Sequence, residues 1–215
     1  MASPTQEYEA YQYAYDYLKK ELFDVNLPPC LITFQRQRRA YGYFYSYGFA
    51  DRNNPTLRTD EIALNPDTFV GCTDKEILST LVHELCHLWQ AHEGKPGRSG
   101  YHNRQWAREM MRVGLQPISL DNPGKMTGQR VTHEIIPGGR FDLAADQLLA
   151  TGFRLRWQSA DVVALNGKVT MKVAKPKRNK VKFTCDECGQ NAWAKPRARL
   201  ICGLCQEPLA RQERW

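Results

Sequence analysis

A five-residue motif, His83-Glu84-Leu85-Cys86-His87, constrains this chain more than any other feature. It reads HExxH and lies in a segment with helical periodicity. Positions i and i+4 of a helix share one face, with Cβ atoms about 5–6 Å apart, so His83 and His87 can both reach one zinc ion. Glu84 stands next to the first ligand, where it can take a proton from a water on the metal. The motif therefore predicts a helical zinc site with its own general base.

The residues around the motif support a helix. Thr73 and Glu76 have the spacing of a capping box, in which each side chain binds the other residue's backbone N–H. Gly94 and Pro96 end the pattern. Between these signals, apolar residues recur at helical spacing: Ile77, Leu78, Leu81, Val82, Leu85, Leu88 and Trp89. We expect the motif to lie beside this apolar stripe, at the edge of a core. The alternative is an amphipathic helix with two surface histidines.

A catalytic zinc normally has three protein ligands and one open position. His92 lies five residues after His87 and should have left the metal face. His102 follows a Gly/Pro-rich turn and precedes a second helical run at 103–113, so a chain reversal would bring it back to the metal. Glu109 is the competing candidate, since some HExxH enzymes take a glutamate from a following helix. The geometry favours His102.

Several stretches around the motif resemble one known family. They are Glu61-Ile62-Ala63-Leu64-Asn65, His83-Glu84-Leu85-Cys86-His87-Leu88-Trp89-Gln90, Gly100-Tyr101-His102-Asn103 and Trp106. Over roughly residues 5–160 the chain resembles the SprT/Spartan family of zinc metalloproteases. The resemblance implies that His83, His87 and His102 bind the catalytic zinc and that Glu84 is the general base.

A second metal signal lies near the C-terminus. Two CxxC pairs, Cys185/Cys188 and Cys202/Cys205, are separated by thirteen residues, the pattern of a zinc ribbon with four thiolates around a structural zinc. Disulfides are the alternative. The first twenty residues are polar and lack the apolar segment of a signal peptide, so we expect a reducing, cytoplasmic location in which such cysteines hold metal. A C-terminal ribbon also resembles several SprT-type proteins of bacteria.

These observations predict an α+β fold. We expect a small zincin-like metalloprotease domain at 1–165, with a short β-sheet packed on helices, then a basic linker or strand at 166–182 and a zinc ribbon at 183–215. Further helices are expected at 7–23, with a buried tyrosine stripe, and at 141–150. No apolar run approaches the eighteen residues of a membrane helix. The expected strands are 31–35, 40–50, 61–65, 129–136, 153–157, 168–173, 180–184 and 200–201.

The positive charge is concentrated at one end. Residues 1–171 carry nineteen Lys/Arg and nineteen Asp/Glu, whereas residues 172–215 carry eleven against four, which accounts for the net charge of +7. Basic side chains neutralise phosphates and an exposed aromatic can stack on a base, so we predict DNA as a partner; a solubilising linker is the alternative. The candidate contacts are Lys175, Lys177, Arg178, Lys180, Lys182, Trp193, Lys195, Arg197 and Arg199.

The expected chemistry is zinc-dependent peptide hydrolysis. Zinc lowers the pKa of a bound water from 15.7 to about 7, and Glu84 accepts the proton. His133 and Tyr101 are candidates for steadying the oxyanion, with a core or surface position as the alternative for His133. We therefore expect two zinc ions, one catalytic and one structural.

Two classes of function remain open. The first is a DNA-associated metalloprotease, for which the Spartan resemblance implies cleavage of proteins crosslinked to DNA. The second is a non-proteolytic nucleic-acid-binding zinc protein that keeps the HExxH fold. The intact Glu84 argues against the second class, because a structural zinc needs no general base. A general intracellular peptidase is a third option, and it leaves the basic tail unexplained.

Overall fold

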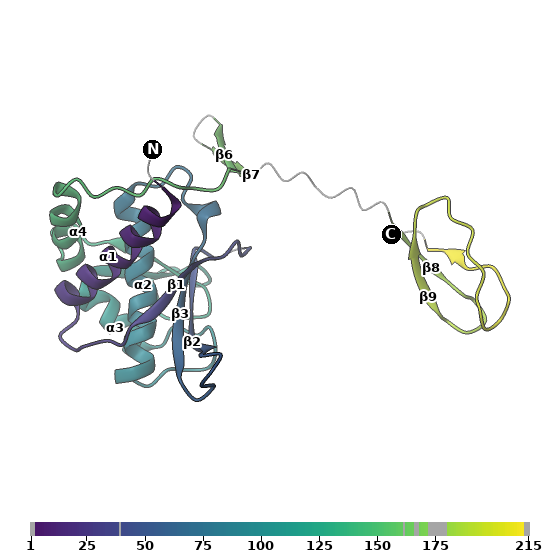
Figure 1. Cartoon of the computed structure of the whole chain (residues 1–215), viewed down its shortest axis with the longest axis horizontal. Helices are drawn as coiled ribbons and strands as arrows, with labels where there is room; N and C mark the ends of the chain where they lie inside the picture. The colour runs from purple at the N-terminus through teal and green to yellow at the C-terminus, as the bar shows by residue number, and fades with distance from the viewer. Residues whose placement is uncertain (1–2, 39, 161, 166–167, 172–179, 213–215) are drawn as a thin grey trace. The chain divides into compact units, whose positions relative to one another are not determined.

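The chain divides into two compact units, Met1–Met171 and Lys172–Trp215. The computed structural model describes residues 3–38, 40–160, 162–165, 168–171 and 180–212 (Figure 1). The predicted domain boundary at 165 falls between the two strands of an antiparallel hairpin, β6 (Val162–Leu165) and β7 (Lys168–Met171), and the first unit includes both. The basic candidates Lys175, Lys177 and Arg178 lie outside the described residues.

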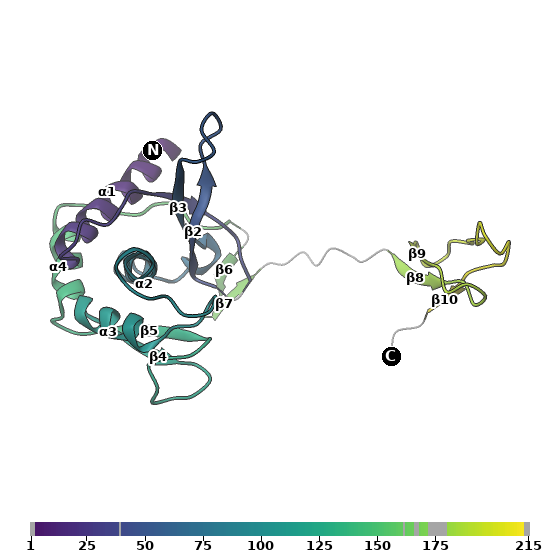
Figure 2. The same ribbon diagram turned by 90° about the horizontal axis from the view of Figure 1, so that it is seen from below.

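The HExxH helix, α2 (Asp74–Glu93), forms the centre of the first unit. Its N-terminus carries the predicted capping box: the backbone N–H of Thr73 donates to Glu76 at 2.7 Å, and the N–H of Glu76 donates to Thr73 at 3.2 Å. Leu78, Leu81 and Leu85 are fully buried. Figure 2 looks along α2 and shows the other helices and the strands arranged around it. Packing on several sides therefore holds the motif rigidly.

Three further helices cover α2, and all three match the sequence predictions. They are α1 (Pro4–Leu22), α3 (Arg104–Val113) and α4 (Arg140–Ala150). The predicted tyrosine stripe of α1 belongs to the core in part, since Tyr11 and Tyr15 are fully buried whereas Tyr8 is exposed. The helix α3 ends at Gly114, whose φ of 97° is left-handed, a conformation that glycine adopts at little cost.

A three-stranded sheet packs on the other side of α2. It consists of β1 (Cys30–Phe34), β2 (Gly42–Ala50) and β3 (Arg58–Leu64) in the order β1-β3-β2. The central strand β3 runs parallel to β1 and antiparallel to β2. Within the described part of the chain, β2 pairs with β3 alone, so its other edge is open. A short 3₁₀ helix, Pro66–Thr68, follows β3.

A second sheet carries the segment after α3. Its strands are β4 (Leu115–Ser119) and β5 (Val131–Ile135), paired antiparallel. The strand β5 was predicted from the sequence, whereas β4, which contains Pro117, was not. Proline lacks the N–H needed in a central strand but is tolerated at an edge. Leu115, Pro117 and Ser119 are buried in the alternating pattern of a strand.

The predicted strand at 153–157 is wrong. This segment has no strand partner within the described residues and binds a side chain instead. The backbone N–H groups of Arg156 and Trp157 donate to the buried carboxylate of Glu7 at 3.1 and 3.3 Å. The acid on α1 thus satisfies the backbone groups that a neighbouring strand would otherwise bind. The resulting architecture is α+β, as predicted, although its sheets are small.

The second unit is a small antiparallel sheet in the order β10-β8-β9. Its strands are β8 (Val181–Thr184), β9 (Asn191–Ala194) and β10 (Ala210–Arg211). Phe183 on β8 is buried in its interior. The predicted strand at 200–201 is only an isolated bridge between Ile201 and Pro208. Across both units, none of the described helices combines the length and the apolar character required to span a membrane.

Candidate metal centres and substrate groove

Three imidazoles meet beside α2. The ligand atoms of His83, His87 and His102 all lie within 4.8 Å of one another. Helical spacing brings the first two together. A backbone bridge holds the third, because the N–H of His102 donates to the carbonyl of Gly128 at 2.9 Å and the N–H of Gly128 donates back at 3.1 Å. The fold thus brings together, from two separate segments, the three histidines that the sequence suggested as zinc ligands.

A hydrogen bond of the His102 ring determines which of its two nitrogens has a free lone pair. Its Nδ1 lies 3.2 Å from the carbonyl oxygen of Gly128. A carbonyl only accepts, so Nδ1 carries the proton and Nε2 of the neutral ring is bare. This Nε2 lies 3.3 Å from Nε2 of His83. Two nitrogens bound to one tetrahedral zinc at about 2.0–2.1 Å lie about 3.3–3.4 Å apart, so the separation fits a shared zinc.

Burial keeps the three rings neutral, as metal ligation requires. It lowers the pKa of His87 to about 3, with the neighbouring His102 adding to the effect. Burial also places the pKa of His83 well below its ordinary value and lowers that of His102, which its bond to Gly128 partly offsets. Trp106, fully buried, packs against all three rings, with centroid distances of 4.8, 5.1 and 4.4 Å to His83, His87 and His102.

Glu84 is the candidate acid–base group of the site. Burial raises the pKa of its carboxyl to about 8, in the range suited to proton transfer near neutral pH. The edge strand β2 passes directly against it at Gly42. A Cβ at position 42 would lie 3.2 Å from Oε1 of Glu84 and 2.8 Å from the carbonyl oxygen of Ala63. Only glycine lets the strand approach this closely, a requirement that the sequence analysis did not recognise.

The site opens into a groove of about 1780 Å³. Its lining includes residues 40–46, which comprise the start of β2 and the two residues before it, together with residues 96–102 and 129–135. Tyr101 lines the groove, with the guanidinium of Arg98 5.2 Å from the centroid of its ring. The groove runs past His83, Glu84 and His87, so an extended chain lying in it would pass the metal site.

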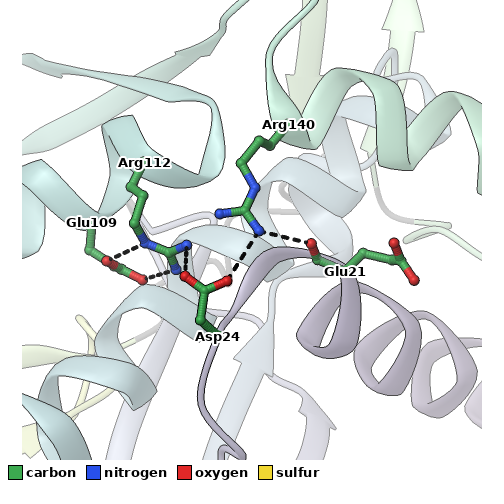
Figure 3. A network of polar contacts seen from close by, with 5 residues as sticks. All are labelled: Glu21, Asp24, Glu109, Arg112 and Arg140. Carbon is green, nitrogen blue, oxygen red and sulfur yellow. Dashed lines mark hydrogen bonds and ion pairs between the residues drawn. The ribbon is translucent and has the colours of Figure 1, made fainter.

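Glu109, the competing third ligand, is committed elsewhere. Its carboxylate oxygen Oε2 accepts a hydrogen bond from Nε of Arg112 at 2.9 Å. The same guanidinium reaches Asp24 at 3.0 Å, and Arg140 joins the network through Asp24 and the carbonyl oxygen of Glu21 (Figure 3). This network ties α3 and α4 to the end of α1. His92 has left the metal face, as expected, and binds Asp60 at 2.6 Å.

His133, one of the two oxyanion candidates, contacts His83 and Ser79. Its Nδ1 lies 3.2 Å from Nδ1 of His83, and its Nε2 lies 2.9 Å from Oγ of Ser79. Both nitrogens are thus engaged with side chains of α2, and the ring also lines the groove. These contacts favour the core position that was the alternative for His133. Burial lowers the pKa of His133 to about 4, so the ring is neutral at pH 7.

The second unit holds the other candidate metal centre. Cys185, Cys188, Cys202 and Cys205 have their sulfur atoms within 4.8 Å of one another. The sulfur atoms of Cys188 and Cys202 are 3.6 Å apart, near the roughly 3.8 Å expected for two thiolates at about 2.3 Å from a tetrahedral zinc. Hydrogen bonds from the backbone N–H groups of Cys205 and Leu204 help to lower the pKa of Cys202 to about 7. The spacing of the four sulfur atoms therefore suits a metal ion.

The described nucleic-acid candidates lie on the surface of this unit. Lys182 on β8 faces Trp193 on β9 as an antiparallel partner, so the two side chains share one face of the sheet. Trp193 is 61% exposed and does not serve as a packing residue of the ribbon core. The other exposed candidates are Lys180, Lys195, Arg197 and Arg199.

Comparison with known proteins places these features in a family. The model of the SprT-like family matches residues 11–135, more than half of the chain. The chain belongs to the SprT-like family. The matched range contains the three-histidine group and Glu84, and the family is in general one of metallopeptidases. This SprT-like protein thus contains a metalloprotease-type domain, and the four-cysteine group lies outside the matched residues.

One curated relative matches a shorter stretch. An uncharacterized protein in the mucB 3' region of Salmonella typhimurium is 48% identical over 52 residues, covering 24% of this chain and 70% of the relative. No solved structure matches the chain.

Proposed function

We propose that this protein is a zinc-dependent endopeptidase. The observation that carries the proposal is the meeting of three neutral imidazoles, with ligand atoms within 4.8 Å, beside the buried carboxyl of Glu84. A zinc ion held by His83, His87 and His102 would supply a Lewis acid that activates water and polarises a carbonyl. Glu84 takes the proton of the attacking water and passes it to the leaving amine.

The groove supports a polypeptide substrate. The free edge of β2 lines it, and an extended peptide can add to such an edge through main-chain hydrogen bonds. Gly42, at the start of β2, lies against Glu84, so a peptide aligned on this strand would carry its scissile bond past the base. Tyr101 lines the same groove and remains our candidate for binding the oxyanion.

We propose further that the substrates are proteins associated with DNA, including those crosslinked to it. The net positive charge lies entirely in residues 172–215, and the exposed face with Lys182 and Trp193 combines a cation with a stacking ring. A structural zinc at the four cysteines would hold this face. The competing function, a nucleic-acid-binding protein without proteolysis, shares the ribbon and assigns no role to Glu84.

The decisive experiment uses one protein substrate in two forms, free and crosslinked to an oligonucleotide. The zinc-loaded chain should cleave the crosslinked form faster, and Glu84→Gln should cleave neither. Equal cleavage of both forms would indicate a general peptidase. Tight DNA binding without cleavage of either form would favour the non-proteolytic alternative.

A further inference from the structure

A chain of hydrogen bonds runs from the backbone of α2 to the back of a metal ligand. The hydroxyl of Ser79 lies 2.7 Å from the carbonyl oxygen of Glu76. Nε2 of His133 lies 2.9 Å from the same hydroxyl, and Nδ1 of His133 lies 3.2 Å from Nδ1 of His83. Ser79 and His83 are four residues apart and share one face of α2, while His133 approaches that face from β5.

The donor and acceptor of each hydrogen bond in this series follow from the first bond, between Ser79 and Glu76. A carbonyl only accepts, so Ser79 donates its single hydroxyl proton to Glu76. Ser79 can then only accept from His133, which must carry its proton on Nε2. A neutral His133 with a proton on Nε2 has a bare Nδ1, which accepts the Nδ1 proton of His83. The remaining nitrogen of His83, Nε2, is left with its lone pair free.

That lone pair faces the metal site. Nε2 of His83 lies 3.3 Å from Nε2 of His102, which is bare for a separate reason, its bond to Gly128. Two bare nitrogens at this distance cannot hydrogen-bond to each other and repel unless a cation lies beside them. The two rings are oriented by separate contacts, and both leave Nε2 bare, the nitrogen that each ring presents to the other.

We propose that His133 is a positioning residue that, together with Ser79, fixes the tautomer and orientation of His83 for zinc binding. The inference rests on the proposed zinc site but not on peptide hydrolysis, because His133 is expected to change the affinity for zinc. Hydrogen-bond partners of metal-binding histidines typically contribute about 10–100-fold in metal affinity. The second zinc, at the four cysteines of the same chain, serves as an internal reference.

Two amides at position 133 separate this role from simple packing. The amide oxygen of asparagine is as many bonds from Cβ as Nδ1 of histidine, so His133→Asn can still accept from His83. The amide nitrogen of glutamine corresponds in the same way to Nε2, so His133→Gln can still donate to Ser79 but offers His83 no acceptor there. Glutamine is nearer to histidine in size, so a packing role predicts the opposite order.

The test is a chelator competition on the full-length zinc-loaded chain and its variants. We expect His133→Gln to release the histidine-bound zinc about 10–100-fold more readily, His133→Asn to stay within a few-fold of the natural chain, and the cysteine-bound zinc to be unchanged. Nitrogen NMR of the histidine rings should show the proton of His83 on Nδ1 in the natural chain. Equal losses in both variants, no loss in either, or a proton on Nε2 of metal-free His83 would overturn the proposal. If the zinc affinities follow this order but the natural zinc-loaded chain cleaves no protein substrate, the proposed function fails and this inference stands.

Discussion

The carboxylate of Glu109 binds the guanidinium of Arg112, with Oε2 2.9 Å from Nε, one turn further along α3. Glu109 is buried, and Arg112 continues the network to Asp24. A carboxylate held in this way is not available to a metal. The contact therefore explains why His102, rather than Glu109, completes the three-residue group.

This contact gives the first prediction. Elemental analysis of the natural chain should find two zinc ions per molecule, and His102→Ala should retain only the ion at the four cysteines. Glu109→Ala should keep both ions but lower the free energy of unfolding by roughly 1–3 kcal/mol, because Arg112 loses charge-assisted hydrogen bonds. Our choice of ligand would be wrong if Glu109→Ala lost the histidine-bound zinc and His102→Ala kept it.

Replacing the general base should separate chemistry from folding. Glu84→Gln keeps the size of the side chain, so zinc content and thermal stability should change little. Cleavage should fall by at least about 100-fold, the contribution typical of a general base. Glu134→Gln is a matched control, since it neutralises an exposed acid that lines the same groove. Proteolysis that survives in Glu84→Gln at the level of the control would contradict the mechanism.

Deleting residues 172–215 should remove most of the DNA affinity, because the remaining chain is balanced in charge. Binding of the full chain should weaken steeply with salt, with a slope of log K against log salt near −0.9 per phosphate for duplex DNA and about −0.7 for single strands. Fluorescence anisotropy at several salt concentrations would measure it. A fragment of residues 1–171 that binds as tightly as the full chain would move the contacts to the protease domain.

Within the ribbon, charge and stacking should be separable. Replacing Lys195, Arg197 and Arg199 together with alanine should reduce the salt slope. Trp193→Ala should instead weaken binding of a single strand by roughly 1–3 kcal/mol with little change in slope. Because Trp193 is exposed, this variant should keep its zinc and its thermal stability. Loss of ribbon zinc in Trp193→Ala would assign the ring a structural role.

The contact between α2 and α4 should make stability depend on pH in the acid range. The ammonium group of Lys75 lies 2.7 Å from Asp142, whose other oxygen accepts from the N–H of Gly138 at 2.8 Å. These bonds, that of Lys75 first, lower the pKa of Asp142 from its ordinary 3.8. A lowered pKa means that the stabilisation is present above pH 3.8 and is lost as the pH falls through the lower value of the folded state.

Asp142→Asn removes this charge with little change in shape. At pH 7 the variant should be less stable than the natural chain by up to about 1 kcal/mol, as for other partly exposed pairs. The difference should shrink as the pH falls below 3.8, because Asp142 of the natural chain is protonated first in the unfolded state and, at lower pH, in the folded state. Denaturant unfolding at pH 7 and pH 3 would measure both values. A difference that grows on acidification would contradict the assigned direction.

Local sequence determined the elements and atoms that depend on neighbours along the chain. The capping box of Thr73 and Glu76, the i,i+4 pair of His83 and His87, and the two CxxC pairs are all short-range patterns. Helix geometry and chain connectivity convert each of them into spatial proximity without help from the rest of the fold. The four main helices were therefore predictable, and so was the location of both candidate metal centres.

Tertiary structure decided whatever depends on partners far along the chain. Nothing in the local sequence indicates that Glu7 binds the backbone at Arg156 and Trp157, so that segment was wrongly predicted as a strand. In the same way, His133 lies 50 residues from His83, and only the packing of β5 beside α2 brings its Nδ1 within 3.2 Å of Nδ1 of His83. A hydrogen bond requires both partners at the right distance and angle, and for distant residues only the assembled fold provides that geometry.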